Sequence, residues 1–181
     1  MDMYYVALIL PEILNEKVLY YKQMMLDKYG CKVGLKSPAH ITMIPPFWMH
    51  PDKEPSLISD LDLLSSGIQP FTVRTNNFSA FKPRTLFIAV ADNLSLSSLK
   101  SVTDSHFKGT QYGIKTETRP FHPHITIATR DLFKKDFADA WNYFSDKNFE
   151  EEWTATGLSL LKHNKKNWDV YHTSQFKNID E

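Results

Sequence analysis

Two copies of the tripeptide His-Ile-Thr are the residues of this chain best suited to chemistry. The first copy is His40-Ile41-Thr42, and the second, His124-Ile125-Thr126, follows 84 positions later. An imidazole has an ordinary pKa of about 6.5, so it can accept or give a proton near neutral pH. A threonine hydroxyl, held stiffly by its β-branched carbon, can donate a hydrogen bond to an oxygen on which charge develops. Two such His/Thr pairs that face one ligand would suit in-line displacement at phosphorus, where one imidazole takes a proton from the incoming oxygen and the other gives a proton to the leaving oxygen.

Each tripeptide lies in a β-branched segment that is typical of a strand. Side chains alternate between the two faces of a strand, so His40 and Thr42 would share one face while Ile41 and Met43 take the other. The second copy repeats this pattern. We therefore expect an apolar back that builds the core and a polar front, and two such fronts could meet across a groove if the two halves are related by a pseudo-twofold axis.

The surrounding elements occur in the same order twice. Apolar spacing predicts, in the first half, a strand at residues 3–10, a helix from 14 to a Gly30 cap, a strand at 38–44, a helix at 54–64 and a strand at 69–74. The second half predicts a strand at 84–90, a helix around 96–102, a strand at 121–127, a helix capped by Asp131, a strand at 153–161 and a hairpin partner at 168–176. The repeated order indicates an internal duplication.

This duplication predicts an α+β fold. We expect a bilobal pseudo-twofold duplication of a β-α-β-α-β unit, with mainly antiparallel sheets and outer helices around a central cleft. Residues 81–84 have only the length of a tight turn, so we expect residues 1–181 to form a single compact domain, with lobe 1 at approximately 1–80 and lobe 2 at approximately 84–181.

The amino-acid composition excludes several classes of protein. Lys and Arg number 21, as do Asp and Glu, so the surface as a whole cannot act as a basic clamp for nucleic acid or for an anionic membrane. The single cysteine, Cys31, forms no internal disulfide, which favours a reducing compartment. Residues 6–10 are too short for a signal segment, and no run reaches membrane-spanning length. We expect a cytoplasmic protein without a membrane partner or an obligate protein partner.

The paired motifs resemble those of the 2H phosphoesterase superfamily, which includes the 2′-5′ RNA ligase-like proteins and the 2′,3′-cyclic phosphodiesterases. The hallmark of that family is a pair of His-x-Thr/Ser-x motifs, which stand here as residues 40–43 and 124–127, with proline-bearing segments at 37–39, 45–47 and 119–123. The resemblance implies a bilobal α+β fold with a central cleft and metal-independent phosphodiester chemistry. It also implies an active site made of His40, Thr42, His124 and Thr126.

Further residues are candidates for binding the substrate. Four cations could reach an anionic group: Lys82, Arg84, Arg119 and Arg130. Three aromatic residues near the motif strands could stack on a nucleobase: Phe47, Phe81 and Phe121. Tyr171 could line the cleft. His122 would share a face with His124 on an undistorted strand, and it is a candidate for an auxiliary role.

The leading prediction is hydrolysis of a 2′,3′-cyclic phosphate on a nucleotide or RNA end, by two histidines and without a metal or another cofactor. The same site run backward would give a 2′-5′ RNA ligase. Two other classes stay open: a nucleotide- or RNA-binding module without turnover, and a metal-dependent hydrolase that uses His40, His122 and His124. A chelator and a pH profile would separate them.

Overall fold

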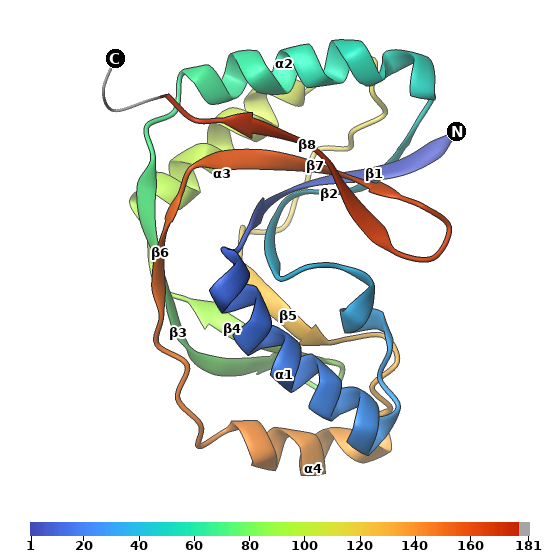
Figure 1. Ribbon diagram of the computed structural model, residues 1–181, viewed down its shortest axis with the longest axis vertical. Helices are drawn as coiled ribbons and strands as arrows, with labels where there is room; N and C mark the ends of the chain where they lie inside the picture. Colours follow the sequence, from blue (N-terminus) through green and yellow to red (C-terminus); the bar gives the residue numbers. More distant parts are fainter. Residues whose placement is uncertain (178–181) are drawn as a thin grey trace.

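The computed structural model describes residues 1–177 and contains two four-stranded sheets and four α-helices in that part of the chain (Figure 1). Every strand pairing among these residues is antiparallel. The strands of the first sheet are, in order across it, β2 (His40–Met49), β1 (Asp2–Ile9), β7 (Gly157–His163) and β8 (Trp168–Gln175). The strands of the second sheet are β5 (His124–Ala128), β4 (Thr85–Val90), β3 (Phe71–Phe81) and β6 (Glu152–Ala155). The α+β class with antiparallel sheets is confirmed.

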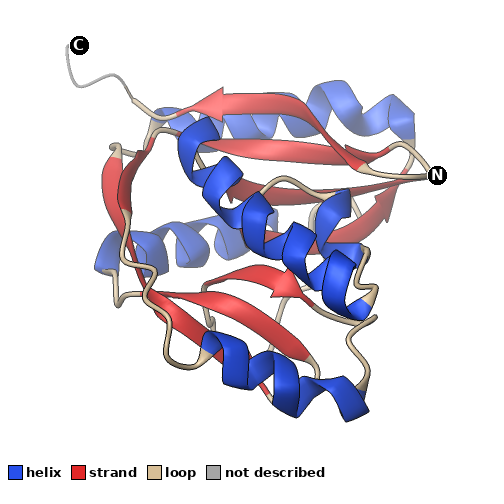
Figure 2. Cartoon of the chain, turned by 60° about the horizontal axis from the view of Figure 1, so that its bottom comes forward, coloured by secondary structure: helices blue, strands red, loops and turns tan. Residues whose placement is uncertain are grey.

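The helices cover the sheets in pairs, and two of them cross between the halves of the sequence. They are α1 (Glu12–Tyr29), α2 (Glu54–Ser66), α3 (Leu94–Phe107) and α4 (Lys134–Phe144). Helix α1 follows β1 of the first sheet in the chain but packs against β5 of the second sheet. Helix α3 follows β4 of the second sheet but packs against β2 of the first. Helix α2 covers β7 and β8, and α4 packs against β3 (Figures 1 and 2). Each motif strand is therefore backed by a helix from the other half.

Helix α1 shows how local sequence fixes these elements. Its buried face carries Leu14, Val18, Lys22 and Met25, at the spacing of one side of a helix. Gly30 adopts φ 71° and its backbone N–H donates to the carbonyl of Leu26, which ends the helix in the left-handed conformation that glycine allows. Two short 3-10 helices precede the next elements: η1 (Val33–Lys36) and η2 (Pro51–Lys53).

The sheets differ from the expected lobes at about 1–80 and 84–181. Strand β3 belongs to the second sheet, and β7 and β8 return to the first. The single strand expected at 153–161 is two strands, β6 and β7, which lie in different sheets and are separated by Thr156. The carbonyl of Thr156 accepts a hydrogen bond from the N–H of Phe176, so the chain is anchored at the residue where it passes from one sheet to the other.

The described part of the chain contains no helix that is both long and apolar enough to cross a membrane.

Candidate active site

Strands β2 and β5 pack against each other and carry the two motifs. Ile41 and Met43 are fully buried and face the core, while His40 and Thr42 are half-buried. The same alternation occurs in β5, where the isoleucines of the motif are buried and His124 and Thr126 are half-buried. The expected apolar back and polar front are therefore both present.

The two motif histidines have the same backbone contact. Nδ1 of His40 lies 2.7 Å from the carbonyl oxygen of Pro38, and Nδ1 of His124 lies 2.7 Å from the carbonyl oxygen of His122. A carbonyl oxygen only accepts hydrogen bonds, so Nδ1 carries the hydrogen in each ring. This contact fixes the tautomer and leaves Nε2 as the nitrogen that can exchange a proton with a ligand.

Both histidines have a pKa below the ordinary value. The pKa of His40 is lowered to about 4, mainly by burial; the hydrogen bond to Pro38 opposes this shift, and the positive charges of Lys22 and His124 contribute to it. Burial also lowers the pKa of His124, with a further contribution from His122. Both imidazoles are therefore neutral at pH 7 in the unliganded protein, and an anion bound between them would favour their protonated forms.

Aromatic rings hold the two imidazoles in place. The Tyr5 ring lies 5.0 Å from the His40 ring and 4.6 Å from the Trp168 ring, between centroids. On the other side, the rings of Phe81 and Phe87 lie 5.2 and 5.0 Å from that of His124. Aromatic packing of this kind restricts rotation of the two imidazole rings.

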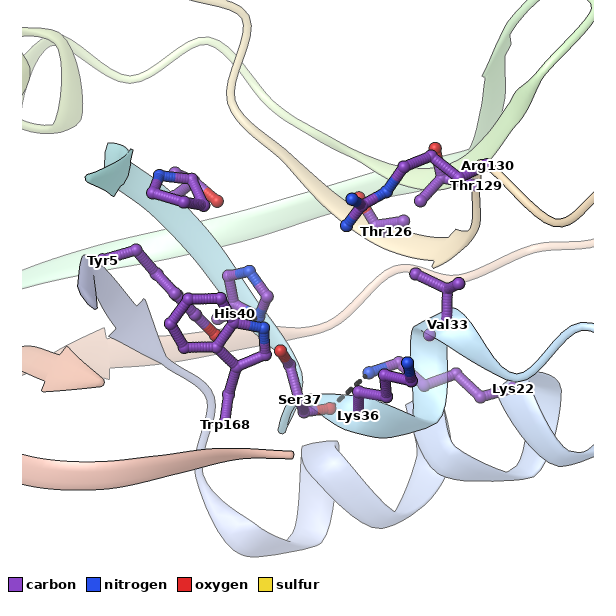
Figure 3. A pocket seen from close by; sticks show the side chains of 13 residues that line it. Tyr5, Lys22, Val33, Lys36, Ser37, His40, Thr126, Thr129, Arg130 and Trp168 are labelled. Atoms are coloured by element: carbon purple, nitrogen blue, oxygen red, sulfur yellow. Dashed lines mark hydrogen bonds between the residues drawn. The ribbon is translucent and has the colours of Figure 1, made fainter. Parts of the chain in front are cut away.

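Two cavities flank the motif strands and share Thr42 in their walls. The first, which we call the His40 cavity, has a volume of about 220 Å³ and is also lined by Thr126, Lys22, Lys36 and Arg130 (Figure 3). The second, the His124 cavity, has a volume of about 510 Å³. Its wall includes Met43, Pro45, Phe81, Lys100, Glu117, Arg119, Phe121 and His122. A ligand at Thr42 would therefore extend into one cavity or into both.

The structure brings several predicted substrate-binding residues to these cavities. Phe81, Arg119, Phe121 and His122 line the His124 cavity, and Arg130 lines the His40 cavity. In Figure 3 the side chain of Arg130 passes over Thr126 and extends toward His40. These five residues remain candidates for contact with the ligand.

The other four predicted residues lie outside both cavities. Phe47 is buried and its ring stacks on that of Tyr4, at a centroid distance of 6.0 Å. Tyr171 donates a hydrogen bond to Glu54 at the start of α2, 2.6 Å away. Lys82 lies 6.0 Å from the centre of the Trp141 ring, and Arg84 is exposed at the turn between β3 and β4.

Strand β5 begins at His124, so His122 precedes the strand instead of sharing its face. The rings of His122 and His124 are 6.3 Å apart between centroids. Among residues 1–177 there is no group of three or more His, Cys, Asp or Glu side chains placed to hold a metal ion. His122 and His124 therefore do not share a strand face as they would on an undistorted strand, because Pro123 is not part of the hydrogen-bonded strand.

Sequence reasoning missed Lys22, Lys36, Tyr5 and Trp168, which all line the His40 cavity. Of these four residues, Lys22 could have been found from the sequence, because it lies four residues after Val18 on the apolar face of α1. A lysine is rarely buried without a reason, so its place on an apolar stripe marks a candidate functional residue. Nothing local indicates Tyr5 or Trp168, because strand pairing brings them to the site.

Asp131 also has a different role from the expected one. Helix α4 begins at Lys134, and no side chain caps it. The Asp131 carboxylate instead accepts hydrogen bonds from the backbone N–H groups of Lys32 and Val33, with the second at 2.9 Å. Asp131 therefore ties the segment after β5 to the η1 segment beside His40.

Comparison with known proteins identifies related sequences. The sequence model of the 2′-5′ RNA ligase superfamily matches residues 21–167. A Halalkalibacterium halodurans protein named "Putative phosphoesterase" is 26% identical over 140 residues, which cover 75% of this chain and 78% of that protein. A Bacillus subtilis protein named RNA 2′,3′-cyclic phosphodiesterase is 32% identical over 71 residues, 37% of this chain and 38% of that protein.

Solved structures share the fold. The crystal structure of TT0787 from Thermus thermophilus aligns with a TM-score of 0.71 at 19% identity and covers 99% of this chain and 100% of that one. Escherichia coli LigT in complex with 3′-AMP aligns with a TM-score of 0.66 at 15% identity and covers 98% of this chain and 99% of that one.

Proposed function

The chain belongs to the 2′-5′ RNA ligase superfamily of 2H phosphoesterases, and from this premise we propose that it hydrolyses 2′,3′-cyclic phosphates of nucleotides or RNA ends. The catalytic groups are His40, Thr42, His124 and Thr126. The observation that carries the proposal is the matched setting of the two imidazoles: each donates its Nδ1–H to the carbonyl of the residue two positions earlier, and Nε2 has no hydrogen bond to any residue of the range 1–177.

Hydrolysis of a cyclic phosphate needs one proton acceptor and one proton donor. One Nε2 takes a proton from water as the water oxygen bonds to phosphorus, and the other gives a proton to the ribose oxygen that leaves. Burial favours the neutral ring more strongly at His40 than at His124, so we assign the accepting role to His40 and the donating role to His124. The product is a ribose monophosphate with one free hydroxyl.

The two threonines complete the site. Thr42 and Thr126 share the polar faces of their strands with the histidines, and both line the His40 cavity. In the proposal their hydroxyls donate hydrogen bonds to the non-bridging phosphate oxygens, where negative charge grows in the transition state. These steps use side chains of this chain alone.

The named relatives support this substrate class. The Bacillus subtilis relative is named an RNA 2′,3′-cyclic phosphodiesterase, and LigT was crystallised with 3′-AMP. Opening of adenosine 2′,3′-cyclic phosphate gives a 2′- or 3′-monophosphate of the same kind. A nucleotide or RNA end is therefore the substrate class that we propose for this chain.

The test is turnover of a panel of nucleoside 2′,3′-cyclic phosphates in excess chelator, with the parent, His40→Ala and His124→Ala compared. A positioned acid or base contributes about 10²–10⁴-fold, so each substitution should cost at least about 100-fold in kcat. His106→Ala, on α3 and outside both cavities, is the matched control. Loss of activity on chelation would favour the metal-dependent alternative, and a loss below tenfold in either variant would contradict the two-histidine assignment.

The same site could also join the 5′-hydroxyl of a second RNA to the cyclic phosphate. One histidine takes the proton of the 5′-hydroxyl as its oxygen bonds to phosphorus, and the other gives a proton to the 3′ oxygen as its bond to phosphorus breaks, which leaves a 2′-5′ linkage. The description of the matching family as a 2′-5′ RNA ligase superfamily favours testing this reaction. Incubation of an RNA that ends in a 2′,3′-cyclic phosphate with a second RNA that has a free 5′-hydroxyl nucleoside would detect a 2′-5′ linkage. Retained binding of the cyclic RNA in a protein that neither opens nor joins it would favour the binding-module alternative.

A further inference from the structure

The two cavities beside the motif strands differ in charge. The wall of the His40 cavity contains Lys22, Lys36 and Arg130 and no acidic residue. The wall of the His124 cavity contains both signs of charge, with Glu117 as well as Lys100 and Arg119. Because the formal charge of the whole chain is zero, this local excess of positive charge is a property of one site and not of the surface.

Lys22 is the buried part of this positive site. Its side chain is 4% exposed, and its ammonium donates one hydrogen bond, to the carbonyl of Ser37 at 3.0 Å. An ammonium carries three donors, so two remain for a ligand in the cavity that Lys22 lines. Burial lowers the pKa of Lys22 to about 8, so the group is still mainly charged at pH 7. A buried charge without an acidic partner is costly, and a bound anion would offset that cost.

Lys36 and Arg130 stand at the mouth of the same cavity. Neither forms an ion pair with any residue of the described range 1–177. Figure 3 shows Lys22 and Lys36 on one wall and Arg130 with Thr126 on the facing wall. Arg130 adopts φ 42°, a strained conformation for a residue with a side chain, and Asp131 holds the adjoining segments together. The cations are therefore placed on opposite sides of one space.

The buried lysine of the other cavity is neutralised. Lys100 is 8% exposed, and its ammonium pairs with Asp104 at 2.7 Å and donates to the carbonyl of Met43 at 2.8 Å. The same cavity is lined by the aromatic rings of Phe81 and Phe121. This composition suits the base and sugar of a nucleotide better than a second anion.

We propose that the part of the His40 cavity lined by Lys22, Lys36 and Arg130 is a subsite for a second phosphate group of the substrate, next to the reacting phosphate at the motif residues. The inference rests on the proposed function, because it places the reacting cyclic phosphate at the two histidines and the second phosphate beside it. The preferred substrate is then a nucleoside 2′,3′-cyclic phosphate that carries a further phosphate, as the last nucleoside of an RNA chain does at its 5′ position. A nucleoside cyclic monophosphate leaves the subsite empty.

Binding of product-like ligands tests the subsite without turnover. We would measure the Kd of adenosine 3′-monophosphate and of adenosine 3′,5′-bisphosphate by calorimetry. A hydrogen bond to a charged group contributes enough to change Kd by about 10- to 100-fold, so the bisphosphate should bind at least about tenfold more tightly to the parent. Lys36→Gln and Arg130→Gln should each reduce this preference several-fold. Lys32→Gln removes the same charge from an exposed position next to η1 that lies outside the cavity, and it should keep the preference.

Turnover is measured separately on adenosine 2′,3′-cyclic phosphate with and without a 5′-phosphate. The parent should show the same preference in kcat/KM, and the two subsite variants should lose more activity on the 5′-phosphorylated substrate than on the other. Equal binding of both ligands by the parent would overturn the subsite. Equal loss on both substrates would also overturn it, because the cations would then serve the reacting phosphate.

The two proposals fail in distinguishable ways. A bisphosphate preference that the variants remove, in a protein that opens no cyclic phosphate, supports the subsite and contradicts the proposed hydrolysis. Turnover of cyclic phosphates without a bisphosphate preference supports the hydrolysis and contradicts the subsite. Both subsite variants change exposed side chains, so both should fold as the parent does.

Discussion

Each imidazole of the pair is held by its own backbone, through a hydrogen bond from Nδ1 to a carbonyl two residues earlier. This arrangement orients the ring without a carboxylate, so the positive charge that forms during proton transfer has no acidic partner at Nδ1. Burial lowers the pKa of each ring, and no carboxylate at Nδ1 offsets that effect until an anion is bound. The substrate phosphate itself would supply that negative charge.

The pH dependence of kcat/KM reports on these two groups. The accepting ring, His40, must be neutral, so activity should fall as the pH drops through about 4. The donating ring, His124, must be protonated, and its pKa is lowered, so activity should fall as the pH rises through a value below 6.5. The expected profile is a bell whose maximum lies between about pH 4 and 6.5. A rate that is flat from pH 5 to 8 would contradict the pair of histidines in these roles.

The hydroxyls of Thr42 and Thr126 can be tested by isosteric change. Valine keeps the shape and the β-branch of threonine but removes the donor, so Thr42→Val and Thr126→Val should each lower kcat by about 10²-fold. Thr42→Ser and Thr126→Ser keep a hydroxyl and should keep most of the activity. If the valine and serine variants are equally active, the hydroxyls do not contact the phosphate.

At the scale of elements, η1 sets the width of the His40 cavity. Gly34 in η1 lies against β5 so closely that a Cβ there would overlap the carbonyl oxygen of Ile127. Gly34→Ala should therefore push η1 away from β5 and displace Lys36. We expect a loss of about 1–3 kcal/mol in the free energy of unfolding and at least a tenfold fall in kcat/KM.

Gly67→Ala is the matched control for that change. A Cβ at Gly67, after α2, would make only an ordinary contact of 3.6 Å with the carbonyl of Leu64. Chemical denaturation and turnover of both variants would check the prediction. Wild-type stability and activity in Gly34→Ala would show that η1 can move freely and does not shape the cavity.

The periodic elements and the two motif strands could be predicted from the sequence, because they depend on local spacing. The apolar face of α1 and the alternation in β2 are read directly from residue types. The exchange of strands could not be predicted in this way. Residues 153–161 read as one strand, and only the pairing of β6 with β3 and of β7 with β1 separates them at Thr156.

The prediction that Asp131 caps helix α4 was wrong for a related reason. Its position before an apolar helix is typical of an N-cap, but its carboxylate bonds to Lys32 and Val33, about a hundred residues earlier in the chain. Tyr5 and Trp168 likewise come to His40 through sheet pairing. The placement of the four motif residues on two neighbouring strands could be predicted because the sequence contains the motif twice, whereas the residues around them come from distant segments.

At the scale of the whole molecule, the two halves are tied together by exchanged elements. Strands β7 and β8 return to the first sheet, and α1 and α3 each pack against the motif strand of the other half. Movement of one sheet away from the other would break these contacts. We therefore expect packing in the folded state to set the distance between the two motif strands.

This packing has a cost at Lys22, which is buried and has no acidic partner among residues 1–177. The cost can be measured with Lys22→Met, which keeps the unbranched shape and most of the length of the side chain and removes the charge. Replacing a buried charge by an apolar group is often neutral or stabilising, so we expect the free energy of unfolding at pH 7 to rise by about 1 kcal/mol. The variant should lose the bisphosphate preference at the same time.

The pH dependence of the free energy of unfolding is an independent test of whether burial of Lys22 destabilises the fold. The pKa of Lys22 is lowered to about 8 in the folded protein from an ordinary value of 10.5, so between these values the unfolded chain binds more protons than the folded one. The parent should therefore gain stability as the pH rises from about 8 to 10.5, and its deficit relative to Lys22→Met should shrink over that range. Lys32→Gln, which changes an exposed lysine, should follow the parent. A deficit that stays constant up to pH 10.5 would show that the Lys22 ammonium is not destabilised by burial, and the free energy that we assign to a bound phosphate would then have another source.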